Sequence, residues 1–484
     1  MTAGRALPAD GKRLGEQMSK KISVVIALVG LCALSLFLLS CGSSSSRPAG
    51  VLYVLTQGSN GTGNNVSTFA MDLNSGGLSL VNSNASTCTP AGGSCGLPLN
   101  IVLNPTGAAA FVLNQGIPCV PQGNLCVSSS NNPIAPSIYP YTVNSDGSLS
   151  APGTALYWTC TSSPCTVTNA LPDTAVAMVR DAAGQYLFVI NQGSSPSPGY
   201  PTPTPTNPSC PHVPTGPTDV CPSISAFAMS SSGLTLAGGS PVYLSKIPTA
   251  LSAITYTPSG PGATAQELLF VTDSVDICTT GCNPQHVDNT LSVFTVSSSG
   301  VVTELKNSPY PTNTDPLSVL AVNTNQAGQG GGVFVYVGSQ PGGSGALNVF
   351  QLCTVDNNGG CTQADVDNQV LIPEVTPPPP STGQNPVSMV VDPTNNFLYV
   401  VCYGSNQVFG YRINTTTGEL TAPTNQQTGS QPVALAIHSS GKFLYTSNST
   451  ANNISGFTLS VTSGAMSSPT TVNSPVGPSG MAAR

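Results

Sequence analysis

The chain has 484 residues, only 6% of them charged, with 12 Lys and Arg against 19 Asp and Glu and a net charge of −7. It contains 50 Gly and 44 Pro, yet short runs of Val, Leu, Ile and aromatic residues recur regularly, which excludes a disordered chain. No segment shows sustained helical periodicity. The composition therefore predicts an all-β fold with long polar loops.

The N-terminus predicts export. Lys20 and Lys21 precede an apolar run over residues 22–39, and residues 38–41 read Leu-Leu-Ser-Cys. A basic start, an apolar centre and a small residue before the cleavage point are typical of a signal peptide. The ending resembles a bacterial lipobox, which implies cleavage before Cys41 and a lipid on that cysteine. The alternative is an uncleaved membrane helix, because 18 apolar residues are near the minimum for a span.

This resemblance divides the chain into a signal peptide with lipobox (residues 1–41), a Ser-rich tether (42–50) and one domain (51–484). Gly42 is not the aspartate that retains a lipoprotein at the inner membrane, so we expect an outer-membrane or surface address. From Gly42 onward, seven Lys and Arg face seventeen Asp and Glu, a net charge of −10. No basic patch can neutralise phosphates, which argues against nucleic acid as a partner. The expected membrane link is the lipid.

Residues 386–478 contain the same sequence pattern twice. Pro386, Pro432 and Pro478 follow one another at intervals of 46 residues, and a fixed period of this size predicts stacked supersecondary units. Each copy holds four short strands, and the run Leu398–Val401 is apolar without alternation. A continuous apolar run is typical of a strand buried on both faces. Four-stranded antiparallel sheets covered on both faces by their neighbours describe the blades of a β-propeller.

Five weaker copies precede these two, so we predict a seven-bladed propeller. The second strands of the seven units are expected at residues 52–54, 110–114, 187–191, 269–273, 334–337, 397–400 and 443–446. The last stretch, Val476–Ala482, is the opening of another blade, while the first unit, which starts at Val51, lacks that opening. We therefore predict that the C-terminal strand completes the N-terminal blade and closes the ring.

The 15 cysteines indicate an oxidising compartment. Six close pairs are candidate disulfides: Cys88 with Cys95, Cys119 with Cys126, Cys160 with Cys165, Cys210 with Cys221, Cys278 with Cys282, and Cys353 with Cys361. The pairs lie in polar insertions and are interpreted as loop staples. The alternative, a metal site, needs histidines at ligand spacing, and only His212 and His286 come near. We predict no metal and no cofactor, and a buried, inert thiol at Cys402.

The motifs Leu398-Tyr399-Val400, Asn406-Gln407-Val408, Tyr411 and Thr417-Gly418-Glu419-Leu420 resemble the YVTN repeats of the lactonase-type seven-bladed propeller family. The similarity extends over nearly all of residues 50–484, and it is strong in blades six and seven and weak in blades four and five. The family includes 6-phosphogluconolactonases and many uncharacterised bacterial surface proteins. The resemblance therefore implies the fold more strongly than it implies an activity.

The residues offer little chemistry. His438 shares a repeat position with Asn104, Asp181 and Asp392, at the start of the turn between the first two strands, so it is predicted to be a turn residue. The string Gly92–Gly96 matches a nucleophile elbow, but no strand and helix flank it. Residues 273–276 and 356–360 hint at calcium, with too few carboxylates for a full oxygen shell. We assign no catalytic residue.

Two functions remain. The first is a monomeric, surface-anchored module, not an enzyme, that binds a protein or glycan through insertion loops on one face. The alternative is an exported lactonase-like hydrolase with its site at the central channel. A sugar-phosphate substrate would need cations, and Arg412 and Lys442 occupy solvated turn or repeat positions. A channel mouth lined by His, Glu and Arg would favour the enzyme, and one lined by Asn, Ser and Thr would favour binding.

Overall fold

The computed structural model of the chain describes residues 50–57, 64–87, 97–115, 120–122, 125–127, 136–157, 175–192, 222–230, 233–244, 246–257, 264–276, 289–325, 331–355, 360–373 and 379–484. The predicted signal peptide, Cys41 and nearly all of the tether lie outside these residues. No helix within the described ranges is long and apolar enough to cross a membrane.

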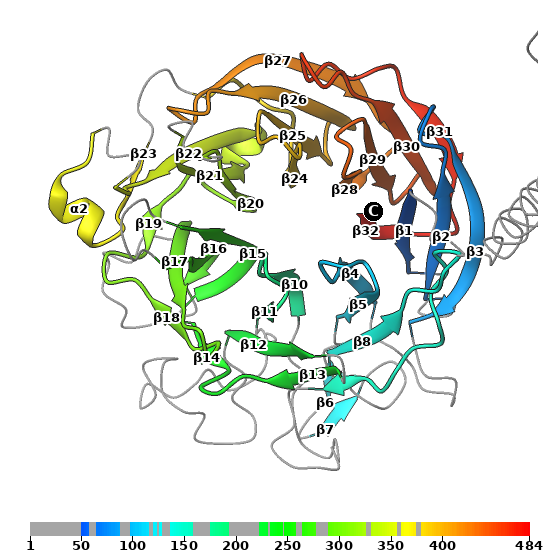
Figure 1. The fold of residues 1–484 in the computed structure, drawn as a ribbon, viewed down its shortest axis with the longest axis horizontal. Coiled ribbons are helices and arrows are strands. Elements are labelled where there is room, and N and C mark those ends of the chain that lie inside the picture. The colour runs from blue at the N-terminus through cyan, green and yellow to red at the C-terminus, as the bar shows by residue number, and fades with distance from the viewer. Residues whose placement is uncertain are drawn as a thin grey trace, which may run out of the picture. The chain divides into compact units, whose positions relative to one another are not determined.

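The described residues fold into seven antiparallel sheets that surround one axis, as Figure 1 shows. From the axis outward, the first four blades are β32 (Pro478–Ala483), β1 (Val51–Thr56), β2 (Asn65–Met71) and β3 (Leu78–Ser86); β4 (Pro98–Leu103), β5 (Ala109–Asn114), β8 (Ser137–Thr142) and β9 (Leu156–Tyr157); β10 (Ala175–Arg180), β11 (Tyr186–Asn191), β12 (Ser223–Ser230) and β13 (Gly233–Leu236); and β15 (Lys246–Tyr256), β16 (Gln266–Asp276), β17 (Thr290–Val296) and β18 (Val302–Glu304).

Blades 5 to 7 are β20 (Pro316–Asn323), β21 (Val333–Ser339), β22 (Ala346–Leu352) and β23 (Leu371–Pro373); β24 (Pro386–Val391), β25 (Phe397–Cys402), β26 (Gln407–Ile413) and β27 (Leu420–Gln427); and β28 (Pro432–Ile437), β29 (Phe443–Asn448), β30 (Asn453–Thr458) and β31 (Thr470–Asn473). Short additions are β14 (Val242–Tyr243) on β12, β19 (Tyr310–Pro311) on β17, and the hairpin of β6 (Val120–Gln122) and β7 (Leu125–Val127). The prediction of a seven-bladed, all-β propeller is confirmed.

The ring closes as predicted. Strand β32 pairs with β1 in antiparallel register, with Tyr53 opposite Ala482 and Thr56 opposite Pro478. Val51 and Arg484 exchange two backbone hydrogen bonds of 3.1 and 2.9 Å. The C-terminal strand thereby occupies the innermost place of the first blade, and it gives β1 a partner that the N-terminal segment does not supply.

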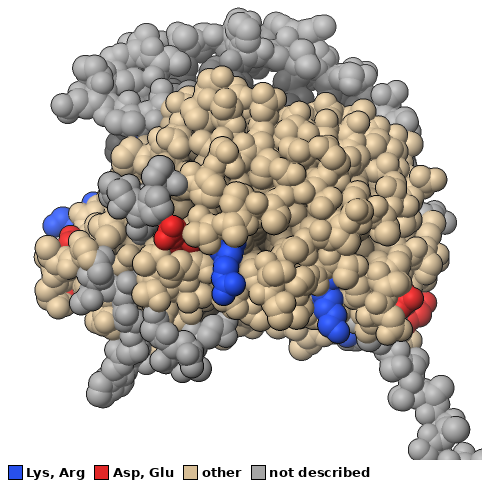
Figure 2. Space-filling model, turned by 90° about the horizontal axis from the view of Figure 1, so that it is seen from above, with Lys and Arg blue, Asp and Glu red and all other residues tan. Residues whose placement is uncertain are grey.

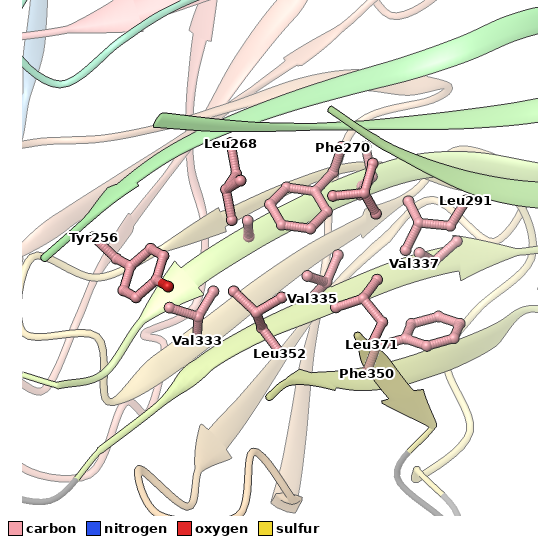
Figure 3. Close-up of a cluster of buried hydrophobic side chains, with 13 residues drawn as sticks. Tyr256, Leu268, Phe270, Leu291, Val333, Val335, Val337, Phe350, Leu352 and Leu371 are labelled. Atoms are coloured by element: carbon pink, nitrogen blue, oxygen red, sulfur yellow. The ribbon is translucent and has the colours of Figure 1, made fainter. Parts of the chain in front are cut away.

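The hydrophobic core is divided into seven clusters, one between each pair of neighbouring blades. Successive side chains of a strand point to opposite faces, so each central strand contributes to two clusters. On β16, Leu268 and Phe270 pack against blade 5, as Figure 3 shows, while Leu269 and Val271 pack against blade 3. All four are fully buried. This two-sided burial explains why the second strands are apolar without alternation.

Tyrosines on the second strands link neighbouring blades by hydrogen bonds, which we call clasps. The hydroxyl groups of Tyr53, Tyr336, Tyr399 and Tyr445 donate to the carbonyl oxygens of Gly147, Gly418, Gly464 and Gly76, at 2.7, 2.9, 3.0 and 2.8 Å. Each acceptor is a glycine in the turn between the third and fourth strands of the next blade. Blades 2, 3 and 4 carry Phe111, Phe188 and Phe270 at the equivalent position. The clasps therefore join blades 1, 5, 6 and 7 to their successors.

The turns between first and second strands are built as predicted. The side-chain oxygens of Asn104, Asp181 and Asp392 each accept hydrogen bonds from the backbone N–H groups four and five residues later. In the equivalent turn, His438 is 4% exposed and its Nδ1 lies 2.8 Å from Ser440 Oγ. His438 is therefore a turn residue of blade 7.

Of the six predicted disulfides, one lies within the described residues. Cys353 and Cys361 form this disulfide, and Cys402 is a buried free thiol, both as predicted. The structure does not test the other five pairs, because the side chains of both partners lie outside its description in every case. These pairs stay predictions: Cys88 with Cys95, Cys119 with Cys126, Cys160 with Cys165, Cys210 with Cys221, and Cys278 with Cys282.

The segment after Cys361 forms a short helix, α2 (Gln363–Asp367), which was not predicted from the sequence. Thr362 and Asp365 form its capping box, in which each side chain accepts a hydrogen bond from the backbone of the other residue. A helix of five residues is too short to show periodicity. The capping pair is therefore the one local signal that could have revealed it.

Candidate functional site

The innermost strands of the seven blades run in the same direction, so the propeller has two distinct ends. We call the end at which these strands begin the upper end, and the opposite one the lower end. The described residues that flank most of the insertions, such as Gln192 and Pro222 in blade 3, follow a second strand or precede a third strand. Those strand ends lie at the upper end. The connections of the predicted binding loops to the blades therefore gather at one end.

One residue per blade defines a ring at the upper end. Each lies on the second strand, opposite the proline near the start of the innermost strand (Ala175 in blade 3), and none is more than 2% exposed. We call this the ring position, and its members are Thr56, Asn114, Asn191, Asp273, Ser339, Cys402 and Asn448. Six of the seven are uncharged types, and Asp273 is the exception.

The neutral ring residues hold neighbouring segments at the upper end. Asn114 Nδ2 donates to the carbonyl oxygen of Thr87, in the segment that leads into blade 2, at 2.9 Å. Cys402 Sγ lies 3.2 Å from Thr382 Oγ1, in the segment that leads into blade 6, and burial raises the pKa of its thiol to about 11. Asn448 Nδ2 donates to Ser455 Oγ, at 2.9 Å. These contacts are structural.

Blade 4 differs because its ring residue is an acid next to a lysine. Ser292 Oγ donates to Asp273 Oδ2 at 2.8 Å, and Thr290 Oγ1 lies 3.4 Å from the same oxygen. Lys246, which is 8% exposed, donates from Nζ to Thr290 Oγ1 at 2.9 Å. Burial raises the pKa of the Asp273 carboxyl to about 7, against the opposing effects of the Ser292 hydrogen bond and the Lys246 charge. This acid is thus ready to exchange a proton near neutral pH.

A second carboxyl with a raised pKa lies on the same strand. Burial raises the pKa of Glu267 to about 7, and the charge of Asp181 acts in the same direction, while a hydrogen bond from Thr255 to Oε2 opposes both. Glu267 precedes Asp273 by six residues on β16, which separates the two by about 20 Å at 3.3 Å per residue. Glu267 therefore lies toward the lower end and cannot act with Asp273 on one substrate.

Cations are few in the described residues. Lys306, Arg412 and Lys442 are exposed, as predicted for Arg412 and Lys442. The guanidinium group of Arg180 donates hydrogen bonds to the carbonyl oxygens of Leu103, Asp181 and Ala182. Figure 2 shows the propeller edge-on, with isolated blue and red side chains on a mostly uncharged surface. Arg180 and Arg484 donate to the carbonyl oxygens of Leu103 and Gly107 at the β4–β5 turn, so the protein itself engages both guanidinium groups at the lower end.

The other predicted candidates are not brought into a site. His212, His286, the string Gly92–Gly96 and residues 356–359 lie outside the described residues. Within the described residues, no three His, Cys, Asp or Glu side chains meet as a metal site. Asp273 was noted in the sequence only as part of a calcium-like string, and its side chain instead binds hydroxyl groups. Aligning the ends of the second strands, which read Asn114, Asn191, Asp273 and Asn448, would have revealed the ring position.

The sequence matches a known family over the regular part of the ring. Residues 348–481 match the family model described as "Lactonase, 7-bladed beta-propeller". The match runs from blade 5 through blades 6 and 7 into the closing strand β32. The predicted resemblance to the lactonase-type propellers is therefore confirmed. No curated protein matches the sequence.

Solved structures extend the likeness in fold to most of the chain. The periplasmic gluconolactonase of Pseudomonas aeruginosa superposes with a TM-score of 0.56 at 14% identity, covering 89% of this chain and 98% of that one. Candidate 6-phosphogluconolactonases of Bacteroides uniformis and Bacteroides fragilis superpose with TM-scores of 0.54 and 0.52, at 13% and 12% identity. Each of the two covers 90% of this chain, over 100% and 98% of its own length. At these identities the likeness establishes the fold.

Proposed function

We infer that the protein is a lactonase-type hydrolase that opens a lactone without a phosphate group, at the upper end of the propeller. Three findings support this function. The family model covers blades 6 and 7, propellers described as lactonases share the fold, and an acid with a pKa near 7 occupies the ring position of blade 4. From the sequence alone this function stood second, behind the binding module, and the comparisons favour it.

The observation that carries the choice of substrate is the distribution of positive charge. A phosphate needs Arg or Lys side chains that converge on it. Of the six in the described residues, Lys246, Arg180 and Arg484 donate to oxygens of the protein itself, and Lys306, Arg412 and Lys442 are exposed. A neutral lactone requires no such cluster.

The test compares two lactones on residues 42–484, the chain without its signal peptide and lipid-bearing cysteine, produced in an oxidising compartment so that its disulfides form. Release of acid from glucono-δ-lactone, corrected for spontaneous hydrolysis, is expected to exceed release from 6-phosphogluconolactone by at least tenfold in kcat/KM. Equal or higher activity on the phosphorylated lactone would contradict the substrate class. Hydrolysis of neither lactone would contradict the function.

The second candidate is the surface-anchored binding module. It is favoured by the insertions that leave the blades at the upper end. The two functions separate in one experiment, because a binding module would retain a protein or glycan ligand on a column while leaving both lactones intact.

The cellular location of the protein is part of the same proposal. A lipid on Cys41 would hold the propeller outside the cytoplasm, at the outer membrane or cell surface. Incorporation of radiolabelled palmitate into the wild-type protein, and its loss in Cys41→Ala, is the expected result. Equal labelling of both proteins would contradict the lipid anchor.

A further inference from the structure

The starting observation is that the repeat assigns the same place to seven residues and puts an acid in one of them. Asn114 and Cys402 contact the segments that lead into their blades, while Asn448, like Asp273, binds a serine on the third strand of its own blade. In blade 4 the leading segment is held by Lys246, at the start of β15, which binds Thr290 on β17. The carboxyl of Asp273 is therefore not needed to hold the segment that leads into its blade.

The contacts of Asp273 leave one oxygen available. Both hydroxyl contacts, from Ser292 and Thr290, fall on Oδ2. No described residue donates a hydrogen bond to Oδ1. Asp273 is 2% exposed and lies one strand away from the innermost strand β15, opposite Pro248. Oδ1 is thus the atom left for a reacting molecule at the upper end.

We propose that Asp273 is the catalytic acid–base group of this hydrolase, with Ser292 and Lys246 as its positioning residues. This assignment rests on the proposed function. In the first step a water molecule attacks the lactone carbonyl carbon while Oδ1 takes the proton of that water. The ring C–O bond then breaks, and the proton passes from Asp273 to the departing alkoxide oxygen. One water is consumed, one hydroxy acid is formed, and Asp273 returns to its starting state.

The groups around Asp273 set its protonation. The charge of Lys246 on β15 and the hydrogen bonds from Ser292 and Thr290 on β17 stabilise the carboxylate. Burial and the charge of Glu304 on β18 stabilise the protonated form. These opposing effects leave the pKa of Asp273 at about 7, in the range where a general base works most effectively at neutral pH.

The main variant is Asp273→Asn, because Asn114, Asn191 and Asn448 already occupy this place in three other blades. The repeat therefore shows that asparagine fits here. We expect kcat for glucono-δ-lactone to fall by about 100-fold or more with KM nearly unchanged, and the acid limb of the pH profile near pH 7 to disappear. Glu267→Gln removes the other carboxyl whose pKa is raised to about 7, and it is expected to keep both kcat and the acid limb.

Lys246→Met adds a readout that a purely structural role would not move. Loss of the ammonium removes an effect that lowers the pKa of Asp273, so the acid limb of the profile should shift to higher pH. Wild-type hydrolysis that persists in Asp273→Asn with an unchanged pH profile would overturn the assignment and leave the proposed function standing. If the wild type hydrolyses no lactone, the proposed function fails and this assignment fails with it.

Discussion

The propeller has a regular part and a divergent part. Blades 1, 5, 6 and 7 carry the clasping tyrosines Tyr53, Tyr336, Tyr399 and Tyr445, whereas blades 2 to 4 carry phenylalanine at the same place. The divergent part holds Lys246 and Asp273, the buried groups on which the proposed chemistry depends. The family model matches only within the regular part.

This difference teaches how the repeat separates stability from function. In the regular part each blade binds the next through a buried hydroxyl group and a glycine carbonyl, so the sequence is constrained in every copy. In blade 3 another tyrosine takes over, because Tyr186 donates to the carbonyl oxygen of Ser298 in blade 4 at 2.8 Å. In blade 5, Gln369, just after α2, donates to Tyr256 of blade 4. The divergent blades thus use individual contacts in place of the repeated clasp.

The largest effect should come from pH acting on the divergent part. A raised pKa means that the folded state keeps a proton which the unfolded state releases near pH 3.8, so stability is highest below that pH and falls as pH rises through about 7. For Asp273 the loss amounts to about 4 kcal/mol, from roughly three pKa units at about 1.4 kcal/mol each. Denaturation midpoints measured from pH 4 to pH 8 should show this slope in the wild type.

Two variants sharpen this prediction. Asp273→Asn should flatten most of the slope, leaving the part that Glu267 contributes with the same sign. Asn448→Asp places a carboxyl at the ring position of blade 7, where Asn453 and Ser455 are the hydrogen-bond partners and neither is charged. It should therefore steepen the slope. A wild type with the same stability at pH 4 and pH 8 would refute the buried acid.

The regular part should be most sensitive at its acceptor glycines. Gly418 has φ +75°, and a Cβ there would lie 2.3 Å from Phe334 Cδ1. Gly418→Ala should therefore cost about 3 kcal/mol, from overpacking together with the left-handed backbone. Gly342 also has positive φ, 58°, but a Cβ there meets nothing within 4 Å, so Gly342→Ala should cost only about 1 kcal/mol. Equal losses in urea denaturation would show that the close approach of blades 5 and 6 is unimportant.

The disulfide marks the border between the two parts. Replacing Cys353 and Cys361 together by serine should lower the free energy of unfolding by about 2–3 kcal/mol, because the unfolded chain loses a constraint. Adding reductant to this double variant then tests the five predicted pairs whose side chains are not described. A further fall in its stability supports them, and no change would contradict all five.

The smallest effect is expected at a single clasp. Tyr399→Phe removes the hydroxyl that binds Gly464 and should cost about 1 kcal/mol by thermal or urea denaturation. The reverse change, Phe270→Tyr, should bring no gain, because the third and fourth strands of blade 5 are joined by the disulfide and α2 instead of a glycine turn. If Phe270→Tyr stabilised the protein, the two parts of the ring would not differ in the way described.

The sequence predicted the fold far better than the site. The 46-residue period and the unbroken apolar runs indicate a stacked ring, because each sheet has to bury both faces, and the unfinished opening at Val476–Ala482 indicated how it closes. The tyrosines were visible as the repeated Leu-Tyr-Val strings, but their acceptors lie up to 369 residues away and are found only in three dimensions. Asp273 could not be identified from spacing, since its pKa depends on burial, and its partners come from two other strands.

The central claim is that chemistry occurs at the upper end, beside the ring position of blade 4. The most direct test is a crystal structure of the mature protein soaked with gluconolactam, in which an amide replaces the lactone ester. We expect the lactam at the upper end, with its carbonyl within about 4 Å of Asp273 Oδ1. A lactam bound at the lower end near Glu267, or on the outer rim of the blades, would contradict the claim.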